Sequence, residues 1–181
     1  MRSLIASQLM TLDGYFEGPN GEFVAPPWNA QLEQYGVDML SKEADTILYG
    51  RTTWQFMKAY WPSANVDEQP VAKYMNASPK VVVSRTLTGE PGWNTRVIGD
   101  IAGVAALKRE PGTKIVLYGS ATLMTALVEA DLIDEYVFMI NPLLMGGGAP
   151  LFRGGPRQQL AHVSTLTCDN GVLLVRYRRA R

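Results

Sequence analysis

Two short stretches of the chain combine residue types that can hold phosphate groups. In each, an apolar run typical of a β-strand ends in tyrosine and glycine, and a sequence typical of a helix start follows at once. The two stretches cover residues 46–54 and 114–122. Gly50 and Gly119 allow a tight turn and a close approach to the backbone. Thr52 and Ser120 are residues that can cap the helices expected to follow.

Free amides at a helix start and the positive end of the helix dipole attract anions. A dinucleotide carries a pyrophosphate and often a further ribose phosphate, so two such turns at neighbouring strand ends predict a site for a nicotinamide nucleotide. Either turn alone is weak evidence, because helix caps occur in every α/β protein. The predicted cofactor-binding residues of the two turns are Gly50, Arg51, Thr52, Thr53, Gly119, Ser120, Ala121 and Thr122.

Two arginines favour NADPH as the cofactor. Arg51 follows the first glycine, and Arg85 lies between the hydroxyl residues Ser84 and Thr86. A guanidinium with hydroxyl groups beside it can bind an additional phosphate. NADH normally requires an acidic residue at the ribose hydroxyls, and neither segment supplies one. The alternative for Arg85 is an arginine in a solvated turn.

Asp13 and Thr11 are the candidate catalytic residues, because they lie at the mouth of the first expected strand. A buried aspartate at that position can orient a substrate or relay a proton. The alternative is an Asp-Gly turn in which the carboxylate bonds its own backbone. Tyr15, Phe16 and Trp28 in the following loop can cover a planar ring, or they can fix that loop in place.

Several other kinds of site are excluded or disfavoured. The chain contains neither the Gly-x-Gly-x-x-Gly fingerprint nor a lysine after a glycine-rich phosphate loop. His162 and Cys168 are the only histidine and the only cysteine, so no metal site, disulfide or Ser-His-Asp triad is expected, and His162 is expected on the surface or in a strand. The glycine run 146–148 is interpreted as a loop between strands, with substrate contact as the alternative.

The composition is that of an ordinary globular protein with one domain over residues 1–181, since 46% of the residues are apolar and 19% are charged. Seventeen basic and seventeen acidic residues cancel, and no nucleic-acid or membrane partner is expected. The arginines near the C-terminus are expected to be solvated. The first apolar run is short for a secretory signal, and a single cysteine fits a reducing compartment, so a cytoplasmic location is expected.

Strand and helix patterns alternate up to residue 130, which predicts right-handed crossovers and a largely parallel sheet. The last third is expected to add antiparallel strands, joined by a hairpin turn at residues 169–171. No regular structure is expected in the loop that extends to Pro27, and residues 63–79 are expected to form a loop or a short helix. The predicted fold is therefore a three-layer α-β-α domain. The expected strands are 3–10, 46–49, 80–84, 95–98, 114–118, 133–140, 161–167 and 172–178, and the expected helices are 30–44, 52–61, 100–110 and 120–130.

The motifs together resemble a known family, the bacterial bifunctional deaminase-reductase C-terminal family, whose founding members reduce a ribosylaminopyrimidine in riboflavin synthesis. The family belongs to the dihydrofolate reductase-like superfamily. The resemblance implies that Gly50 to Thr53 hold cofactor phosphates and that Ser84 and Arg85 approach the ribose phosphate. It also implies that residues 119–122 line the pyrophosphate, that Thr11 and Asp13 lie near the nicotinamide, and that the chain forms a homodimer. The motifs that carry the resemblance are Thr11-Leu12-Asp13-Gly14, Gly50-Arg51-Thr52-Thr53-Trp54, Val82-Val83-Ser84-Arg85, Tyr118-Gly119-Ser120, Asp134-Glu135-Tyr136 and Asn141-Pro142-Leu143-Leu144.

The resemblance implies a stand-alone NADPH-dependent reductase of a small heterocyclic, pyrimidine-like or pterin-like, or carbonyl substrate. Three departures bear on the substrate. Ser7 stands where the riboflavin reductases usually have lysine, the zinc signature of the deaminase half is absent, and neither Glu33 nor Asp38 can be matched to the pterin carboxylate of folate reductases. The alternatives are a non-enzymatic small-molecule binding protein that uses the same cleft and a true dihydrofolate reductase.

Overall fold

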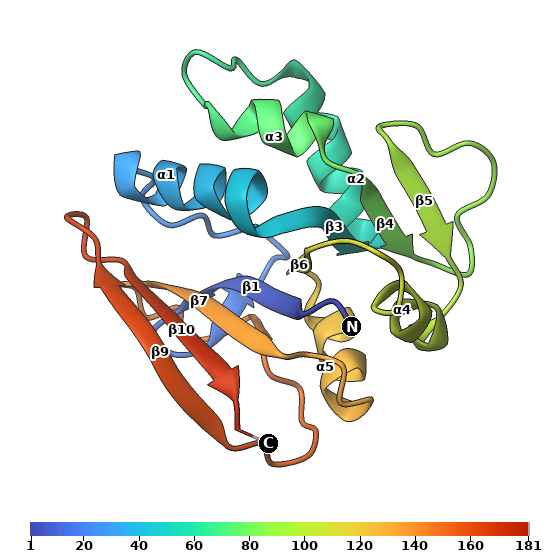
Figure 1. Cartoon of the computed structure of the whole chain (residues 1–181). Coiled ribbons are helices and arrows are strands. Elements are labelled where there is room, and N and C mark those ends of the chain that lie inside the picture. The colour runs from blue at the N-terminus through green and yellow to red at the C-terminus, as the bar shows by residue number, and fades with distance from the viewer. Residues whose placement is uncertain (181) are drawn as a thin grey trace.

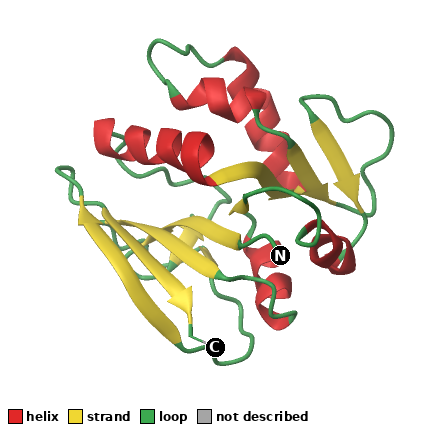
Figure 2. Ribbon diagram, viewed as in Figure 1, coloured by secondary structure: helices red, strands yellow, loops and turns green. Residues whose placement is uncertain are grey.

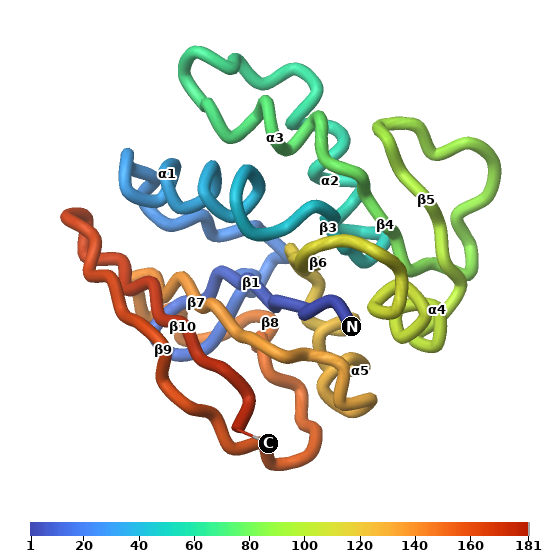
Figure 3. Tube along the Cα trace, in the orientation of Figure 1, coloured from blue at the N-terminus to red at the C-terminus, as the bar shows by residue number. Residues whose placement is uncertain are grey.

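The computed structural model describes residues 1–180 and contains one sheet of eight strands between two layers of helices (Figures 1 and 2). The strands lie in the order β5-β4-β3-β6-β1-β7-β10-β9. The two edge strands of the sheet are β5 and β9 (Figure 3). The strands are β1 (Leu4–Thr11), β3 (Ala44–Gly50), β4 (Lys80–Val83), β5 (Thr95–Ile98), β6 (Lys114–Tyr118), β7 (Glu135–Asn141), β9 (Leu160–Thr167) and β10 (Leu173–Arg179).

The six strands from β5 to β7 are all parallel, and β10 runs antiparallel to both β7 and β9. The predicted mixed sheet with an antiparallel C-terminal part is therefore confirmed. The hairpin turn between β9 and β10 is also confirmed. Gly171 takes a φ of 83° there, and its amide donates to the carbonyl of Cys168 at 2.9 Å.

Each face of the sheet is covered by its own group of helices, as a three-layer α-β-α architecture requires (Figure 1). The first group packs Leu32, Trp54 and Met75 onto one face, and the second packs Val104 and Leu127 onto the other. The first group is α1 (Ala30–Asp38), α2 (Arg51–Tyr60) and α3 (Val71–Ala77), and the second is α4 (Ile101–Leu107) and α5 (Ala121–Glu129). None of the helices within residues 1–180 combines the length and the apolar character that a membrane span requires.

One helix ends differently from the sequence prediction, and another stops before Pro62 as predicted but is followed by a short 3-10 helix. The expected helix 30–44 contains α1 and then widens into a π-helical turn at Met39–Glu43, which leads directly into β3. After α2, a short 3-10 helix covers Trp61–Ser63 and includes Pro62. The segment expected as a loop or short helix holds α3.

The loop before Pro27 contains regular structure, which corrects the prediction that it has none. Strand β2 (Tyr15–Glu17) pairs antiparallel with β8 (Ala149–Pro150) and forms a small second sheet. Gly148 lies so close to this strand that an added Cβ would be 2.2 Å from the carbonyl oxygen of Glu17. The pairing joins segments that are far apart in the sequence, and local patterns do not reveal such a partner.

Arg176 of β10 is another correction, because the C-terminal arginines were expected to be solvated. Its side chain is only 16% exposed and donates to Glu43 at 2.6 Å and 2.9 Å and to Glu135 at 2.8 Å. Lys114 donates to the same two carboxylates at 3.0 Å and 3.1 Å. The two cations and two carboxylates form a network without net charge. Glu43 ends the π-helical turn, Lys114 and Glu135 start β6 and β7, and Arg176 lies in β10.

Candidate functional site

The predicted cofactor residues lie at the carboxyl edge of the sheet, where crossover helices begin. Leu48 of β3 pairs with Leu117 of β6, and Gly50 pairs with Val83 of β4. Gly50 therefore ends β3, and Ser84 and Gly119 directly follow its two parallel neighbours, β4 and β6. The structure thus brings together the three segments that the sequence analysis assigned to one ligand.

The two glycine turns touch each other. A Cβ added to Gly50 would lie 2.7 Å from Oγ of Ser120, and one added to Gly119 would lie 2.8 Å from Cγ2 of Thr53. Gly119 also has a φ of 59°, which disfavours other residues, and the peptide bond that joins it to Ser120 is cis. Glycine at both positions lets one turn pack against the start of the opposite helix.

Helix α5 begins as predicted, because Ser120 is its N-cap and accepts a hydrogen bond from the amide of Leu123 at 3.3 Å. The prediction that Thr52 caps the other helix is wrong. Helix α2 already begins at Arg51, and its N-cap is Gly50, which has no side chain to offer. Thr52 lies inside the first turn, so no side chain caps the amides at this helix start.

Arg51 joins the end of β3 to the turn that follows β4. Its Nη1 donates to Oγ1 of Thr86 at 3.1 Å. The hydroxyl of Ser84 accepts from the amides of Thr86 and Leu87 at 3.2 Å and 3.0 Å, so it shapes its own turn. Arg85 is exposed, and its guanidinium makes no hydrogen bond or ion pair within residues 1–180.

The structure places Asp13 at the surface, whereas the sequence analysis considered a buried aspartate at this position. The carboxylate accepts from Oγ1 of Thr11 at 2.6 Å and from the amides of Met145 and Gly146 at 3.1 Å and 2.8 Å. These hydrogen bonds, first that of Thr11, lower the pKa of Asp13 to about 2. Thr11 is fully buried and also accepts from the amide of Tyr15 at 3.0 Å. Asp13, with Thr11 bonded to it, therefore holds in place the loop that contains the glycine run 146–148. The carboxylate thus bonds backbone, as in the Asp-Gly turn alternative, but the backbone of a segment far along the chain.

The aromatic residues of the loop fix its conformation, in agreement with the second alternative. Nε1 of Trp28 donates to Glu33 at 2.8 Å, and Phe16 packs against the core and lies 5.8 Å from the Arg153 guanidinium. The other oxygen of Glu33 accepts from the amide of Val71 at 2.6 Å. Each carboxylate oxygen of Glu33 thus accepts one structural hydrogen bond.

Sequence reasoning missed a group of hydroxyls on the face covered by α1. Ser7 of β1 pairs with Tyr118 of β6, and Oγ of Ser7 lies 3.1 Å from the hydroxyl of Tyr35 in α1. Strand β1 reads Leu-Ile-Ala-Ser-Gln-Leu-Met-Thr, without alternation of apolar and polar residues, so no local signal marked Ser7 or named the residues opposite it.

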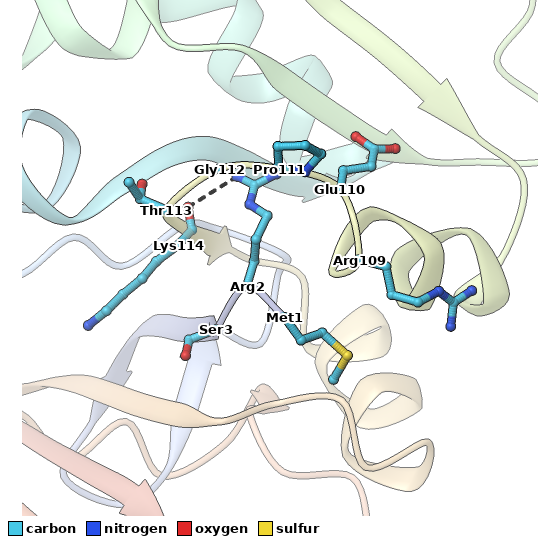
Figure 4. A pocket seen from close by; sticks show the side chains of 9 residues that line it. All are labelled: Met1, Arg2, Ser3, Arg109, Glu110, Pro111, Gly112, Thr113 and Lys114. Atoms are coloured by element: carbon cyan, nitrogen blue, oxygen red, sulfur yellow. Dashed lines mark hydrogen bonds between the residues drawn. The ribbon is translucent and has the colours of Figure 1, made fainter.

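A hollow elsewhere on the molecule lies at the opposite edge of the sheet (Figure 4). It is lined by the residues around the starts of β1 and β6, where Arg2 donates to the carbonyl of Lys114 at 3.4 Å. Arg2 also pairs with Asp45 and donates to Thr46 at 2.7 Å. The side chain of Arg2 therefore joins the starts of neighbouring strands at this hollow. The hollow is separate from the carboxyl edge of the sheet, where the amides of the helix starts point outward.

Comparison with known proteins identifies the family. The RibD C-terminal domain matches residues 2–174. The chain is 35% identical to the uncharacterized protein YyaP of Bacillus subtilis over 97% of this chain and 94% of that one. The fold is similar to that of a pyrimidine reductase-like protein from Corynebacterium diphtheriae, with a TM-score of 0.70, 13% identity and coverage of 99% and 92%. It is also similar to dihydrofolate reductase from Enterococcus faecalis complexed with NADP(H), with a TM-score of 0.68, 14% identity and coverage of 99% and 97%. The fold is thus dihydrofolate reductase-like, and the chain belongs to the RibD C-terminal domain family.

Proposed function

We propose that the protein is a stand-alone NADPH-dependent reductase of a small heterocyclic or carbonyl substrate. The observation that carries the proposal is the contact between the two glycine turns at neighbouring strand ends. Membership in the RibD C-terminal domain family supports a reductase. The similarity to a dihydrofolate reductase complexed with NADP(H) supports the choice of cofactor.

The residues at this edge fit a phosphate-bearing cofactor. Side chains at Gly50 and Gly119 would fill the space between the turns, and the first turn of α2 has no side-chain cap. We assign the cofactor phosphates to the helix starts at residues 51–53 and 120–122, and the ribose phosphate to Arg85 and Arg51. NADPH supplies hydride when bound, while the protein positions the substrate and excludes water.

Asp13 and Thr11 take a positioning role in this proposal. The carboxylate of Asp13 is ionised at neutral pH and bonded to the loop at residues 145–146, so it carries no proton to donate. We propose that the two residues fix the loop beside the substrate site. A cytoplasmic location, proposed from the free Cys168, agrees with a cofactor kept reduced inside the cell.

Fluorescence titration with NADPH and NADH tests the proposal directly. We expect wild type to bind NADPH at micromolar concentration, and Arg85→Ala to weaken NADPH about tenfold or more while it leaves NADH nearly unchanged. The matched control is Arg109→Ala, an exposed arginine at the opposite edge of the sheet. No NADPH binding by wild type would refute the function, and equal losses for both cofactors would refute the role of Arg85.

A second candidate is a binding protein without catalysis. It is favoured by one observation, that the carboxylates of Asp13 and Glu33 are both occupied by structural hydrogen bonds. NADPH oxidation assayed against pyrimidine, pterin and quinone compounds separates the two functions. Turnover with any of them excludes the binding protein. The occupied Glu33 also argues against a true dihydrofolate reductase, which an assay with dihydrofolate tests.

A further inference from the structure

One face of helix α2 contacts the segment of residues 84–94, which joins β4 to β5. Arg51 and Trp54 lie three positions apart in this helix, so their side chains point to the same side. Nη1 of Arg51 donates to Oγ1 of Thr86 at 3.1 Å, near the start of the segment. Nε1 of Trp54 donates to Oγ1 of Thr95 at 3.1 Å, directly after its end. Helix α2 therefore holds the segment at both ends.

Lys58 is the third residue of this face, four positions after Trp54. Its Nζ donates to the carbonyl of Pro91 at 2.5 Å and lies 5.0 Å from the centre of the Trp54 ring. No other backbone group of residues 88–92 forms a hydrogen bond within residues 1–180. A charged donor forms a stronger hydrogen bond than a neutral one. Lys58 is therefore the residue that fixes the middle of the segment.

The last residues of the segment do not hold their own conformation. Trp93 and Asn94 have φ values of 51° and 49°, in the left-handed region that bulky side chains rarely adopt. Nε1 of Trp93 donates to Oδ1 of Asn76 at 2.8 Å, and Nδ2 of Asn94 donates to the carbonyl of Ala77 at 3.1 Å. Such a backbone persists only where surrounding contacts determine it. The conformation of the segment therefore depends on side-chain contacts with the neighbouring helices.

The position of Arg85 depends on this segment. Its exposed guanidinium makes no hydrogen bond or ion pair within residues 1–180, so only the backbone of its turn places it. The proposed function assigns the ribose phosphate to Arg85 and Arg51. A phosphate shared by two guanidinium groups is bound more tightly when both groups are already in place.

We infer that Lys58 is a positioning residue, which holds residues 84–94 against α2 and thereby sets a preference for NADPH over NADH. The inference rests on the proposed function for the place of the ribose phosphate. NADH lacks this phosphate, so the loss of the Lys58 contact is expected to affect NADPH alone.

Fluorescence titrations with NADPH and NADH test the inference in wild type and in single and double variants. Lys58→Met keeps an unbranched side chain but removes the donor, and Lys58→Arg restores a charged donor. Arg85→Ala is combined with Lys58→Met in the double variant. The matched control is Lys73→Met, at an exposed lysine of α3.

Lys58→Met is expected to weaken NADPH about fivefold and to leave NADH unchanged, while Lys58→Arg recovers most of the loss and Lys73→Met has no effect. In the Arg85→Ala background, Lys58→Met is expected to add no further loss, because both residues act on the same phosphate. A general structural role would weaken both cofactors or add to the loss from Arg85→Ala. Either result, or an unchanged affinity for NADPH in Lys58→Met, would overturn the inference and leave the proposed function standing.

Hydrogen exchange without cofactor separates this inference from the proposed function. The amides of Thr86 and Leu87 donate to Oγ of Ser84, and their exchange is expected to become about threefold faster or more in Lys58→Met. If wild type does not bind NADPH, the proposed function fails and the cofactor preference fails with it. Faster exchange would then still assign the hold on the segment to Lys58, and unchanged exchange would overturn that as well.

Discussion

The carboxylate of Asp13 holds two distant parts of the chain together. It bonds Thr11 at the end of β1 and the amides of Met145 and Gly146, with distances of 2.6 to 3.1 Å. An ionised carboxylate accepts such hydrogen bonds more strongly than a neutral amide does. The position of the glycine loop therefore depends on the charge of one exposed side chain.

Asp13→Asn should release this loop. The amide side chain replaces one acceptor oxygen with a donor, so we expect hydrogen exchange at Met145 and Gly146 to become about tenfold faster. Asp38→Asn is the control, since Asp38 is bonded only to its neighbours on the same helical segment. The folded pKa of about 2 lies below the ordinary value of 3.8, so wild-type protection should be complete above pH 4 and lost as the pH falls toward 2. Unchanged exchange in Asp13→Asn would show that the carboxylate does not hold the loop.

Lys80 is a buried cation at the start of β4. Its side chain is 1% exposed, and Nζ donates to the carbonyl of Asn76 at 2.8 Å and lies 4.3 Å from the Trp93 ring. Burial lowers the pKa of Lys80 to about 8 from its ordinary value of 10.5. Between these values the unfolded chain binds more protons than the folded one, so the contribution of Lys80 to stability rises with pH and is lowest below pH 8.

Lys80→Met should remove this pH dependence. Urea denaturation at pH 7.5 and pH 10 should show that wild type gains about 1 to 2 kcal/mol of unfolding free energy relative to the variant over this interval. Lys73→Met serves as the control, because Lys73 is exposed on the adjacent helix. A constant difference between wild type and Lys80→Met at the two pH values would contradict the shifted pKa.

At the scale of elements, the site depends on the contact between two turns from neighbouring crossovers. Gly119→Ala adds a Cβ 2.8 Å from Thr53 and places alanine at a φ of 59°. We expect it to weaken NADPH at least tenfold and to lower the unfolding free energy by more than the roughly 1 kcal/mol of the backbone conformation alone. Gly89→Ala measures that backbone term, since Gly89 has a φ of 78° and open space around it. Equal stability losses and unchanged NADPH affinity in both variants would show that the turns do not need their contact.

Sequence patterns predicted most elements because their signals are local. The apolar run before Gly119, the cap Ser120 and the hairpin turn at residues 169–171 each act within a few residues. The pairing of β2 with β8 was missed because its partners lie more than a hundred residues apart. Thr52 was misassigned as a cap because Gly50, two residues earlier, itself adopts the extended N-cap conformation, and the helix begins at Arg51.

The two glycine turns of the candidate site were predictable, and the neighbouring group of hydroxyls was not. Gly50 and Gly119 mark turns by residue type. That β3 and β6 are neighbours could not be read from the alternation of strands and helices, because β4 and β5 lie between them in the chain. Tyr118 and Ser7 carry no such local mark. Their proximity depends on the register of β6 against β1, which only the three-dimensional structure supplies.

At the scale of the whole molecule, the free edge of the sheet at β9 is the candidate contact for the expected homodimer. Strand β9 is the last strand of the sheet, and Ala161 to Thr167 are all exposed. Val163 is 42% exposed, and Leu166, which pairs with Leu174 of β10, is 43% exposed. A long exposed edge strand with apolar side chains is a template for another chain unless something covers it. We propose that a second copy covers β9 and that the protein is a homodimer.

Leu166→Lys should weaken this dimer. A charge in the middle of an apolar contact is costly to desolvate, so we expect light scattering to give the mass of two chains for wild type and a dissociation constant at least tenfold higher for the variant. Leu144→Lys is the control, because Leu144 is 69% exposed in the loop after β7 and lies outside the edge strand. Hydrogen exchange in β9 should slow with protein concentration in wild type and in the control, but not in Leu166→Lys. A monomeric wild type would contradict the homodimer and leave β9 to be protected by its own polar residues, Ser164, Thr165 and Thr167. A dimer that Leu144→Lys disrupts as strongly as Leu166→Lys would place the contact outside β9.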